Sequence, residues 1–350
     1  MRCILTILFF FLLGSTYCEE STKDSLLKDW SNSELLDTVR MNSLKDLIFD
    51  HYCYENPDSA ISLSEELALK ASESAHIEWL GHSHNLRGIA MNVKGEIAQS
   101  MNHYKKALKI YLEIDDRKSQ AAVMNNMANI FQDQGNQVRA LEYYEKSLEI
   151  DESIGDSLGM AVTLMNIGIV HLAQGHAENT LQFFLQGLKI VDDQKLENMR
   201  GPVLNNLASV YHSMGMTDSA IVYFERSLKI RRDNEDAYGT ARVLDNMGEV
   251  LLSVGDTNEA LKSHLEALSI NQSKGYKENL PGNYEQLGRI QFFRKNYKQT
   301  QLYGDSSLAL GKEMGNVNHI RDAAKLLSEV YDAQSKSNIL PTEITIENLK

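Results

Sequence analysis

The chain has 350 residues, of which 43% are hydrophobic and 24% are charged, and this composition excludes an intrinsically disordered protein. A formal charge of −13 excludes a protein that binds nucleic acid or anionic lipid through a basic surface. The sequence has three cysteines, Cys3, Cys18 and Cys53, which are too few for a disulfide framework.

The first eighteen residues have the layout of a secretory signal peptide. Arg2 gives a positive start, Cys3 to Leu13 is almost unbroken apolar sequence, and the small residues Gly14 to Thr16 follow. The apolar run is about half of the ~20 residues that cross a bilayer, which disfavours an anchor. We therefore expect a secreted, periplasmic or cell-envelope protein. A lipoprotein with Cys18 as its lipidated first residue stays an alternative, and only then do we expect contact with a membrane.

Residues 19–40 follow as a predicted helix that caps the rest of the chain. Apolar residues recur there at helical spacing, with polar residues between them. These apolar residues are Leu26, Leu27, Trp30, Leu35 and Leu36.

The remainder of the sequence repeats every forty residues. Glycine returns at Gly95, Gly135, Gly175, Gly215 and Gly255, and Lys295 occupies the next position without the glycine. A fixed period of this length indicates stacked structural repeats. A stacked repeat protein offers a long curved surface instead of one enclosed catalytic cleft.

Each repeat predicts two antiparallel helices joined by a glycine turn. Between Val123 and Ile150, apolar residues at i, i+3, i+4 and i+7 form one buried stripe before Gly135, and a second apolar helix follows. One column of the first helix holds only very small residues, which allows the two helices to approach closely. This column reads Gly88, Ala128, Gly168, Ala208, Gly248 and Gly288.

The sequence therefore predicts an all-α solenoid of about seven helical hairpins between residues 41 and 335, with capping helices. The expected hairpins lie near 41–74, 81–114, 121–154, 161–194, 201–234, 241–274 and 281–314. A closing helix is expected at 317–335, and the tail at 336–350 fits no repeat and is expected to be loosely held.

These columns resemble the tetratricopeptide repeat, in the forty-residue form seen in kinesin light chains and in bacterial signalling and sensor proteins. The resemblance is carried by the small residues, the turn glycines and the aromatic residues. Those aromatic residues are Tyr104, Phe131, Tyr144, Phe184, Tyr211 and Phe224. The resemblance implies a right-handed solenoid that holds a peptide or a partner protein in its concave groove.

A second stripe of the first helices is rich in asparagine. Asn126 lies about 200° around the helix from Ala128. Because asparagine is a poor residue for the middle of a helix, something must offset its cost. The column of Asn126 reads Leu86, Asn126, Asn166, Asn206, Asn246 and Gln286, and the preceding column reads Asn85, Asn125, Met165, Asn205, Asp245 and Glu285.

Two interpretations of this ladder stay open, and both can hold together. In the first, the amides line the concave groove and hold a peptide backbone, as the family resemblance implies. In the second, the asparagines bond to neighbouring helices and fix the solenoid. The mixed charge of the groove disfavours the acidic tails that short tetratricopeptide repeats bind. The predicted peptide-binding residues are Asn125, Asn126, Asn129, Asn166, Asn205, Asn206, Ser209, Asp245, Asn246, Glu249 and Arg289.

No other pattern in the sequence predicts a catalytic residue, a metal, a cofactor or a small-molecule substrate. His82 and His84 could ligate a metal, but no third ligand has suitable spacing nearby, which favours a turn or groove edge. Cys53 lies on an apolar helical pattern with Phe49 and Tyr52, so we expect a small buried hydrophobic residue and not a nucleophile.

The sequence thus favours a non-enzymatic interaction module that binds a peptide or partner segment. The alternative is the sensory or regulatory part of a bacterial signal-transduction system. Proteins of that kind continue into a membrane helix and an output domain, whereas this sequence stops at Lys350 with an incomplete repeat. The alternative therefore requires a chain that lacks its output domain.

Overall fold

The computed structural model of the protein describes residues 20–54 and 56–347, with side chains for 23–54 and 56–335. The predicted signal peptide at 1–18 lies outside the described residues. Within the described ranges every element is a helix and no strand occurs, so the predicted all-α repeat solenoid is confirmed. Among these helices, none combines the length and the apolar character that a membrane span requires.

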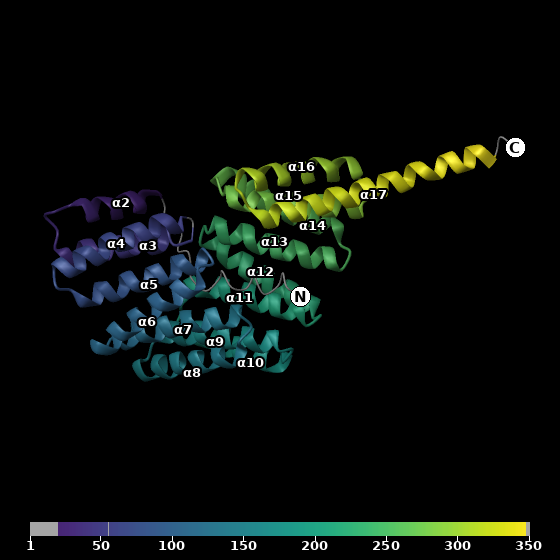
Figure 1. Cartoon of the computed structure of the whole chain (residues 1–350). Helices are drawn as coiled ribbons and strands as arrows, with labels where there is room; N and C mark the ends of the chain where they lie inside the picture. Colours follow the sequence, from purple (N-terminus) through teal and green to yellow (C-terminus); the bar gives the residue numbers. More distant parts are fainter. Residues whose placement is uncertain (1–19, 55, 348–350) are drawn as a thin grey trace. The chain divides into compact units, whose positions relative to one another are not determined.

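The chain divides into two compact units, the first ending at Val203 and the second beginning at Leu204 (Figure 1). In each unit, helices that follow one another in sequence pack side by side. The first unit holds α2 (Glu20–Ser31), α3 (Asp37–His51), α4 (Pro57–Glu73), α5 (Ile77–Val93), α6 (Ile97–Glu113), α7 (Arg117–Asp133), α8 (Gln137–Ile154), α9 (Ser157–Ala173) and α10 (Ala177–Asp193). Helix α11 (Glu197–Ser213) contains the division, and the second unit continues with α12 (Thr217–Asp233), α13 (Ala237–Ser253), α14 (Thr257–Lys274), α15 (Leu280–Phe293), α16 (Tyr297–Glu313) and α17 (Val317–Glu347).

The backbone repeats every twenty residues, which is half the period of the turn glycines. Turns inside the hairpins place glycine at positive φ, from Gly95 (78°) to Gly255 (84°), and Lys295 takes the same conformation with φ 58°. Turns between hairpins are also left-handed, although most have no glycine. The residues with positive φ in the turns between hairpins are Ala75, Asp115, Gly155, Lys195, Glu235, Gly275 and Gly315.

Lys295→Gly is expected to raise the free energy of unfolding by about 1 kcal/mol, because only glycine adopts a left-handed conformation without steric cost. Ala309→Gly, at an exposed position inside α16, is the matched control and is expected to lower it by about 1 kcal/mol. Urea unfolding of the full chain measures both changes. If Lys295→Gly destabilises the protein as much as Ala309→Gly does, the backbone at Lys295 is not strained.

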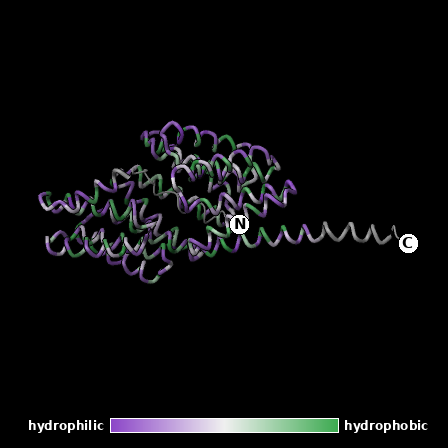
Figure 2. The backbone as a smooth tube through the Cα atoms, turned by 90° about the horizontal axis from the view of Figure 1, so that it is seen from above, coloured by the Kyte–Doolittle hydropathy of each residue, from purple (hydrophilic) through white to green (hydrophobic). Residues whose placement is uncertain are grey.

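From α5–α6 to α13–α14, the core is built where the small-residue column of each first helix meets an aromatic residue of its second helix, whereas Gly288 of α15 faces Leu326 of α17. A Cβ atom on Gly88 would lie 2.4 Å from the ring of Tyr104, and one on Gly168 would lie 2.8 Å from the ring of Phe184. Both aromatic side chains are buried. Apolar and polar residues accordingly alternate along each helix (Figure 2). The close approach predicted from the small residues is therefore present.

Helix boundaries differ from the predicted ones at two kinds of place. First helices begin about one turn before the predicted repeats, as α7 does at Arg117, because Asp116 caps it by accepting a hydrogen bond from the backbone N–H of Ser119 (3.1 Å). Asp156 and Asp236 cap α9 and α13 in the same way. The closing helix α17 starts at Val317 but continues to Glu347, into the segment expected to be a loosely held tail.

Candidate functional site

The asparagine ladder consists of two columns, which we call the acceptor column and the donor column. The acceptor column is Asn85, Asn125, Met165, Asn205, Asp245 and Glu285, and the donor column is Leu86, Asn126, Asn166, Asn206, Asn246 and Gln286. Both columns lie in the middle of the first helices, one residue apart.

Three of the four donor-column asparagines bond to the acceptor column of the preceding hairpin, whereas Asn206 Nδ2, opposite Met165 in sequence register, has no partner among the described residues. In the first unit, Asn126 Nδ2 donates to Asn85 Oδ1 (3.2 Å), and Asn166 Nδ2 donates to Asn125 Oδ1 (2.8 Å). In the second unit, Asn246 Nδ2 donates to Asn205 Oδ1 (3.0 Å). The three bonds join residues 41 positions apart, so the ladder holds consecutive repeats together. This is the bonding that the second interpretation of the ladder predicts.

In the first unit the ladder continues into a buried polar relay that ends on a carboxylate. Asn125 Nδ2 donates to Thr163 Oγ1 (2.8 Å), and the Thr163 hydroxyl donates to Asp151 Oδ2 (3.5 Å). Each donor points toward the next acceptor, and Asp151 is the last residue of the series. The Asp151 side chain is buried, and desolvation, followed by the nearby Asp156 carboxylate, raises the pKa of Asp151 to about 6.

Asp151→Asn is expected to make the protein more stable near pH 7 by about 1–3 kcal/mol. The folded-state pKa of about 6 lies above the ordinary value of 3.8, so the folded protein binds the proton more tightly. The stabilisation from that proton is complete below the unfolded pKa and is lost as the pH rises through the folded pKa. Urea unfolding from pH 4 to pH 7 should therefore show the advantage of the variant growing with pH. A constant difference across this range would contradict the assignment.

The second unit has the equivalent relay, three repeats later, with the hydrogen bonds in the opposite direction. Asn271 Nδ2 donates to Asn283 Oδ1 (2.7 Å), and Asn283 Nδ2 donates to both carboxylate oxygens of Asp245 (2.9 and 2.7 Å). His264 Nδ1 lies 2.9 Å from Asp245 Oδ1. Here the carboxylate stands in the acceptor column instead of at the far end. Because a carboxylate only accepts hydrogen bonds, the donors of each relay point toward its carboxylate.

Burial separates the predicted site residues into two groups. Four are inside the protein, namely Asn125 (8% exposed), Asn166 (7%), Asn205 (2%) and Asn206 (1%). The other seven are half-buried or exposed and therefore accessible, namely Asn126, Asn129, Ser209, Asp245, Asn246, Glu249 and Arg289. We call these seven, with the half-buried Gln286, the accessible ladder residues. Only this second group has side chains that a partner can reach.

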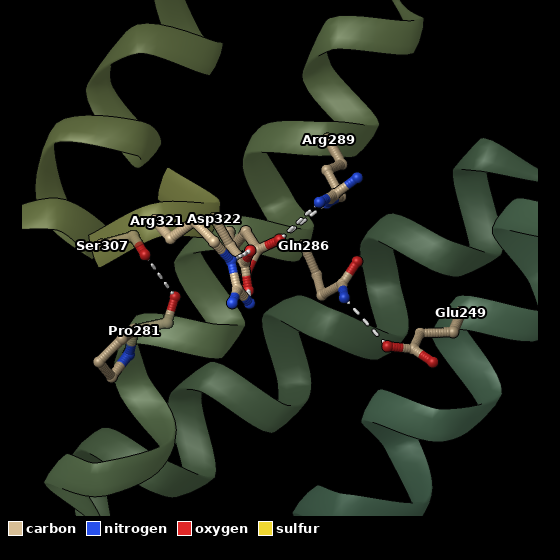
Figure 3. A network of polar contacts seen from close by, with 8 residues as sticks. Glu249, Pro281, Gln286, Arg289, Ser307, Arg321 and Asp322 are labelled. Carbon is tan, nitrogen blue, oxygen red and sulfur yellow. Dashed lines mark hydrogen bonds and ion pairs between the residues drawn. The ribbon is translucent and has the colours of Figure 1, made fainter. Parts of the chain in front are cut away.

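Charged groups concentrate among the accessible ladder residues of the second unit (Figure 3). Glu249 accepts a hydrogen bond from Gln286 Nε2 (3.0 Å), and Arg289 pairs with Glu285 (2.8 Å). Desolvation by the surrounding protein raises the pKa of Glu249, and the carboxylates of Asp245 and Glu285 raise it further. Glu249 is nevertheless exposed, so its carboxylate is available to a cationic or hydrogen-bond-donating group.

In the first unit, the accessible amides lie next to a buried tyrosine. The hydroxyl of Tyr144 donates to Asn129 Oδ1 and lies 2.9 Å from Gln132 Oε1. Asp133 follows on the same helix, is exposed, and has a pKa raised to about 6 by desolvation. Because Tyr144 bonds to the oxygen of Asn129, the Nδ2 of this amide takes no part in the contact.

The histidines raised by the sequence as candidate metal ligands are bonded separately, and the candidate nucleophile is buried. His82, Ser83 and His84 bond to different partners, namely Tyr111 Oη, the Ser64 carbonyl and His103. No group of three or more potential metal ligands occurs among the described residues. Cys53 is fully buried, and desolvation raises the pKa of its thiol to about 12, so it is the small hydrophobic residue that the sequence predicts.

Five residues of the relays were not predicted, namely Asp151, Thr163, His264, Asn271 and Asn283. For three of them the sequence holds a signal, because each is a polar residue in a column that is apolar or aromatic in other repeats. Thr163 and Asn283 share a column with Val123, Val203 and Val243. His264 stands in the aromatic column of Phe184 and packs on Gly248, as the rings of other repeats do on their small residues. Such exceptions point to buried polar networks, whereas the column of Asp151 is mixed and gives no such signal.

Comparison with known proteins identifies the repeat. The family model for the tetratricopeptide repeat matches residues 119–193 and 200–273. Over these two segments the chain carries tetratricopeptide repeats. Tetratricopeptide repeats stack into extended binding surfaces, which agrees with the accessible ladder residues on successive first helices. None of the curated proteins compared with the chain matches it significantly.

Solved structures with the tetratricopeptide fold resemble the chain over most of its length. BtubC from P. vanneervenii is 20% identical with a TM-score of 0.54, covering 63% of this chain and 92% of its own. The apo form of RapI is 19% identical with a TM-score of 0.57, covering 79% and 98%. A Rap protein complexed with Competence and Sporulation Factor is 16% identical with a TM-score of 0.58, covering 87% and 88%. At these identities the likeness establishes the fold.

Proposed function

We propose that the accessible ladder residues bind an extended peptide or a segment of a partner protein, without a covalent step. The observation that supports this proposal is that some side chains of the ladder are buried and others are accessible. Asparagine bonds with at least one buried partner or with Asn85 join consecutive repeats, while amide and charged side chains on the same first helices stay accessible. Asn126 and Asn246 contribute to both functions, since each uses its Nδ2 in the ladder while its Oδ1 has no partner within the described part of the chain.

The chemistry of these side chains suits a peptide backbone. An amide side chain both donates and accepts, as does the peptide group, so binding need not depend on the sequence of the ligand. Glu249 and Arg289 add one acceptor and one cation that would favour particular ends or side chains. A similar fold binds a signalling factor in the Rap complex, which supports a peptide or protein partner without naming one.

The proposal includes export of the protein by the leader at residues 1–18. Amino-terminal sequencing of the protein purified from its source tests this part. A mature chain that begins close to residue 19 is expected. An intact Met1 would contradict export by cleavage.

Binding is tested with the triple variant Glu249→Ala, Gln286→Ala and Arg289→Ala. A partner is first captured from the source envelope, identified by mass spectrometry and purified, and its Kd for the full chain is measured. We expect the variant to weaken binding roughly a hundredfold, because a few residues carry most of the affinity of an interface. Circular dichroism should show an unchanged helical content.

The matched control is Glu259→Ala with Lys262→Ala, which removes an exposed ion pair from α14. It changes charged surface residues in the neighbouring helix and leaves the ladder intact. We expect an unchanged Kd for this control. A triple variant that folds and binds as tightly as the control would show that the ladder is structural only.

A further inference from the structure

Hairpin α5–α6 departs from the other hairpins at three positions of the core columns. It places His84, Arg87 and His103 where the next three hairpins have apolar or aromatic residues, although α14 has Ser263 at the position of His103. Those apolar or aromatic residues are Met124, Met127 and Tyr143, then Leu164, Ile167 and Phe183, then Leu204, Leu207 and Tyr223. Three titratable groups in apolar columns of one hairpin require an explanation, because burying a charge without a partner is costly.

The two histidines meet directly. His84 Nδ1 lies 3.0 Å from His103 Nδ1, and the ring centroids are 5.1 Å apart. Only one of the two nitrogens can carry a hydrogen in this contact, so the two imidazoles cannot both be protonated while the contact is kept. Desolvation, and then the charges of His103, Arg87 and Lys106, lower the pKa of His84 to about 4. Desolvation and the same two cations also lower the pKa of His103.

Arg87 is a cation with little compensation. Its side chain is 15% exposed, and its Nε is buried with no hydrogen-bond partner among the described residues. The carboxylate of Glu65 is 3.7 Å from Arg87 Nη2, beyond hydrogen-bonding distance, and its side chain is 64% exposed. Desolvation accordingly lowers the pKa of Arg87. The guanidinium therefore has an unpartnered N–H, and its charge is not compensated by a hydrogen-bonded carboxylate among the described residues.

We propose that Arg87, His84 and His103 form a binding site for an oxyanion, either a phosphate or a carboxylate group, with Lys106 close by. An oxyanion can accept hydrogen bonds from the Arg87 guanidinium and from protonated imidazoles at the same time. The bound oxyanion would also compensate the positive charge of Arg87 and of the protonated His84 and His103, which stand in otherwise apolar columns. The site lies on α5 and α6 and uses none of the accessible ladder residues, so it is independent of the proposed peptide binding.

Affinity for the anion should increase as the pH falls. Protonation of His84 and His103 adds positive charge beside Arg87 and Lys106, and the bound anion in turn raises the pKa of both imidazoles. Among the described residues, Glu65 on α4 is the carboxylate that lies near Arg87 and His103, and it competes with the ligand. Binding is therefore expected to be tighter at pH 5.5 than at pH 7.5.

The test titrates the full chain with sodium phosphate or with sodium acetate, against sodium chloride at equal ionic strength. Isothermal calorimetry gives the affinity, and NMR of the imidazole C–H groups gives the pKa values of His84 and His103. We expect saturable binding of at least one oxyanion, with an upward shift of both pKa values. The anion that binds with the higher affinity, phosphate or acetate, identifies the chemical group that the site recognises. The absence of saturable binding in both arms would overturn the proposal.

Arg87→Met supplies the matched variant, because methionine stands at the same position in Met127 and Met247. It should keep the fold, unfold at a urea concentration at least as high without anion, and weaken oxyanion binding about ten- to a hundredfold. His103→Tyr, which introduces the residue type found at Tyr143, gives a second variant that should also lose binding. Glu65→Gln should instead tighten binding by removing the competing carboxylate. Equal affinity in the wild type and Arg87→Met, or weaker binding in Glu65→Gln, would contradict the site.

Discussion

Phe184→Ala is expected to lower the free energy of unfolding by about 3–5 kcal/mol, because it removes a fully buried ring from the contact between α9 and α10. Leu185→Ala is the matched control on the next residue of α10, where the side chain is 42% exposed. We expect the control to change stability by less than about 1 kcal/mol. Urea unfolding of the full chain measures both variants.

Substitutions at Gly168, which faces the Phe184 ring, test this contact more specifically. Gly168→Val alone should destabilise by about 1–3 kcal/mol, since the added Cβ would lie 2.8 Å from the Phe184 ring. In the Phe184→Ala background the same valine fills part of the cavity and should stabilise the protein. The effect of Gly168→Val therefore reverses sign in the double-mutant cycle. Additive destabilisation would contradict the pairing of small and aromatic columns.

Asp245→Ala is expected to lower the free energy of unfolding by about 3–4 kcal/mol, because it leaves two buried donors without their acceptor. These donors are His264 Nδ1, on a fully buried side chain, and Asn283 Nδ2, on a side chain that is 2% exposed. Asp245→Asn keeps the shape and one acceptor oxygen and should cost about half as much. Chemical denaturation at pH 7 measures these differences.

A compensating variant tests whether the loss of stability comes from buried donors that have lost their acceptor. His264→Phe restores the aromatic residue of Phe184 and Phe224, and Asp245→Asn restores the amide of Asn125. Together they remove the carboxylate and the buried imidazole that faces it, so the double variant should be more stable than Asp245→Asn alone. A double variant less stable than both single variants would contradict this account of the relay.

The hairpins could be predicted because packing repeats in the sequence. Small residues such as Gly88 and Gly168 are required wherever two helices approach closely, and turn glycines such as Gly135 are favoured wherever φ is positive. The twenty-residue backbone period could not be predicted in the same way. Turns between hairpins use Ala75 or Asp115 at φ 59° and 55°, and such residues have no recognisable signature of a left-handed turn.

The ladder columns were predictable, but the division between buried and accessible residues was not. Asn125 and Asn126 are about 100° apart on one helix, and the packing of the neighbouring repeat decides which of them it covers. The relays depend on partners on other helices, such as Asp151 for Thr163, whose pairing no local pattern fixes. The binding function of the accessible residues stays a prediction that rests on their exposure and chemistry.

Site-specific photo-crosslinking to the purified partner tests the central claim most directly. A benzophenone amino acid is placed at Asn126 or Gln286 among the accessible ladder residues, and at Lys146 or Lys262 on exposed positions of second helices. Crosslinks to the partner from the first two positions and not from the last two are the expected result. Crosslinks from Lys146 or Lys262 alone would show that the partner binds another face, and the proposed function of the ladder would be wrong.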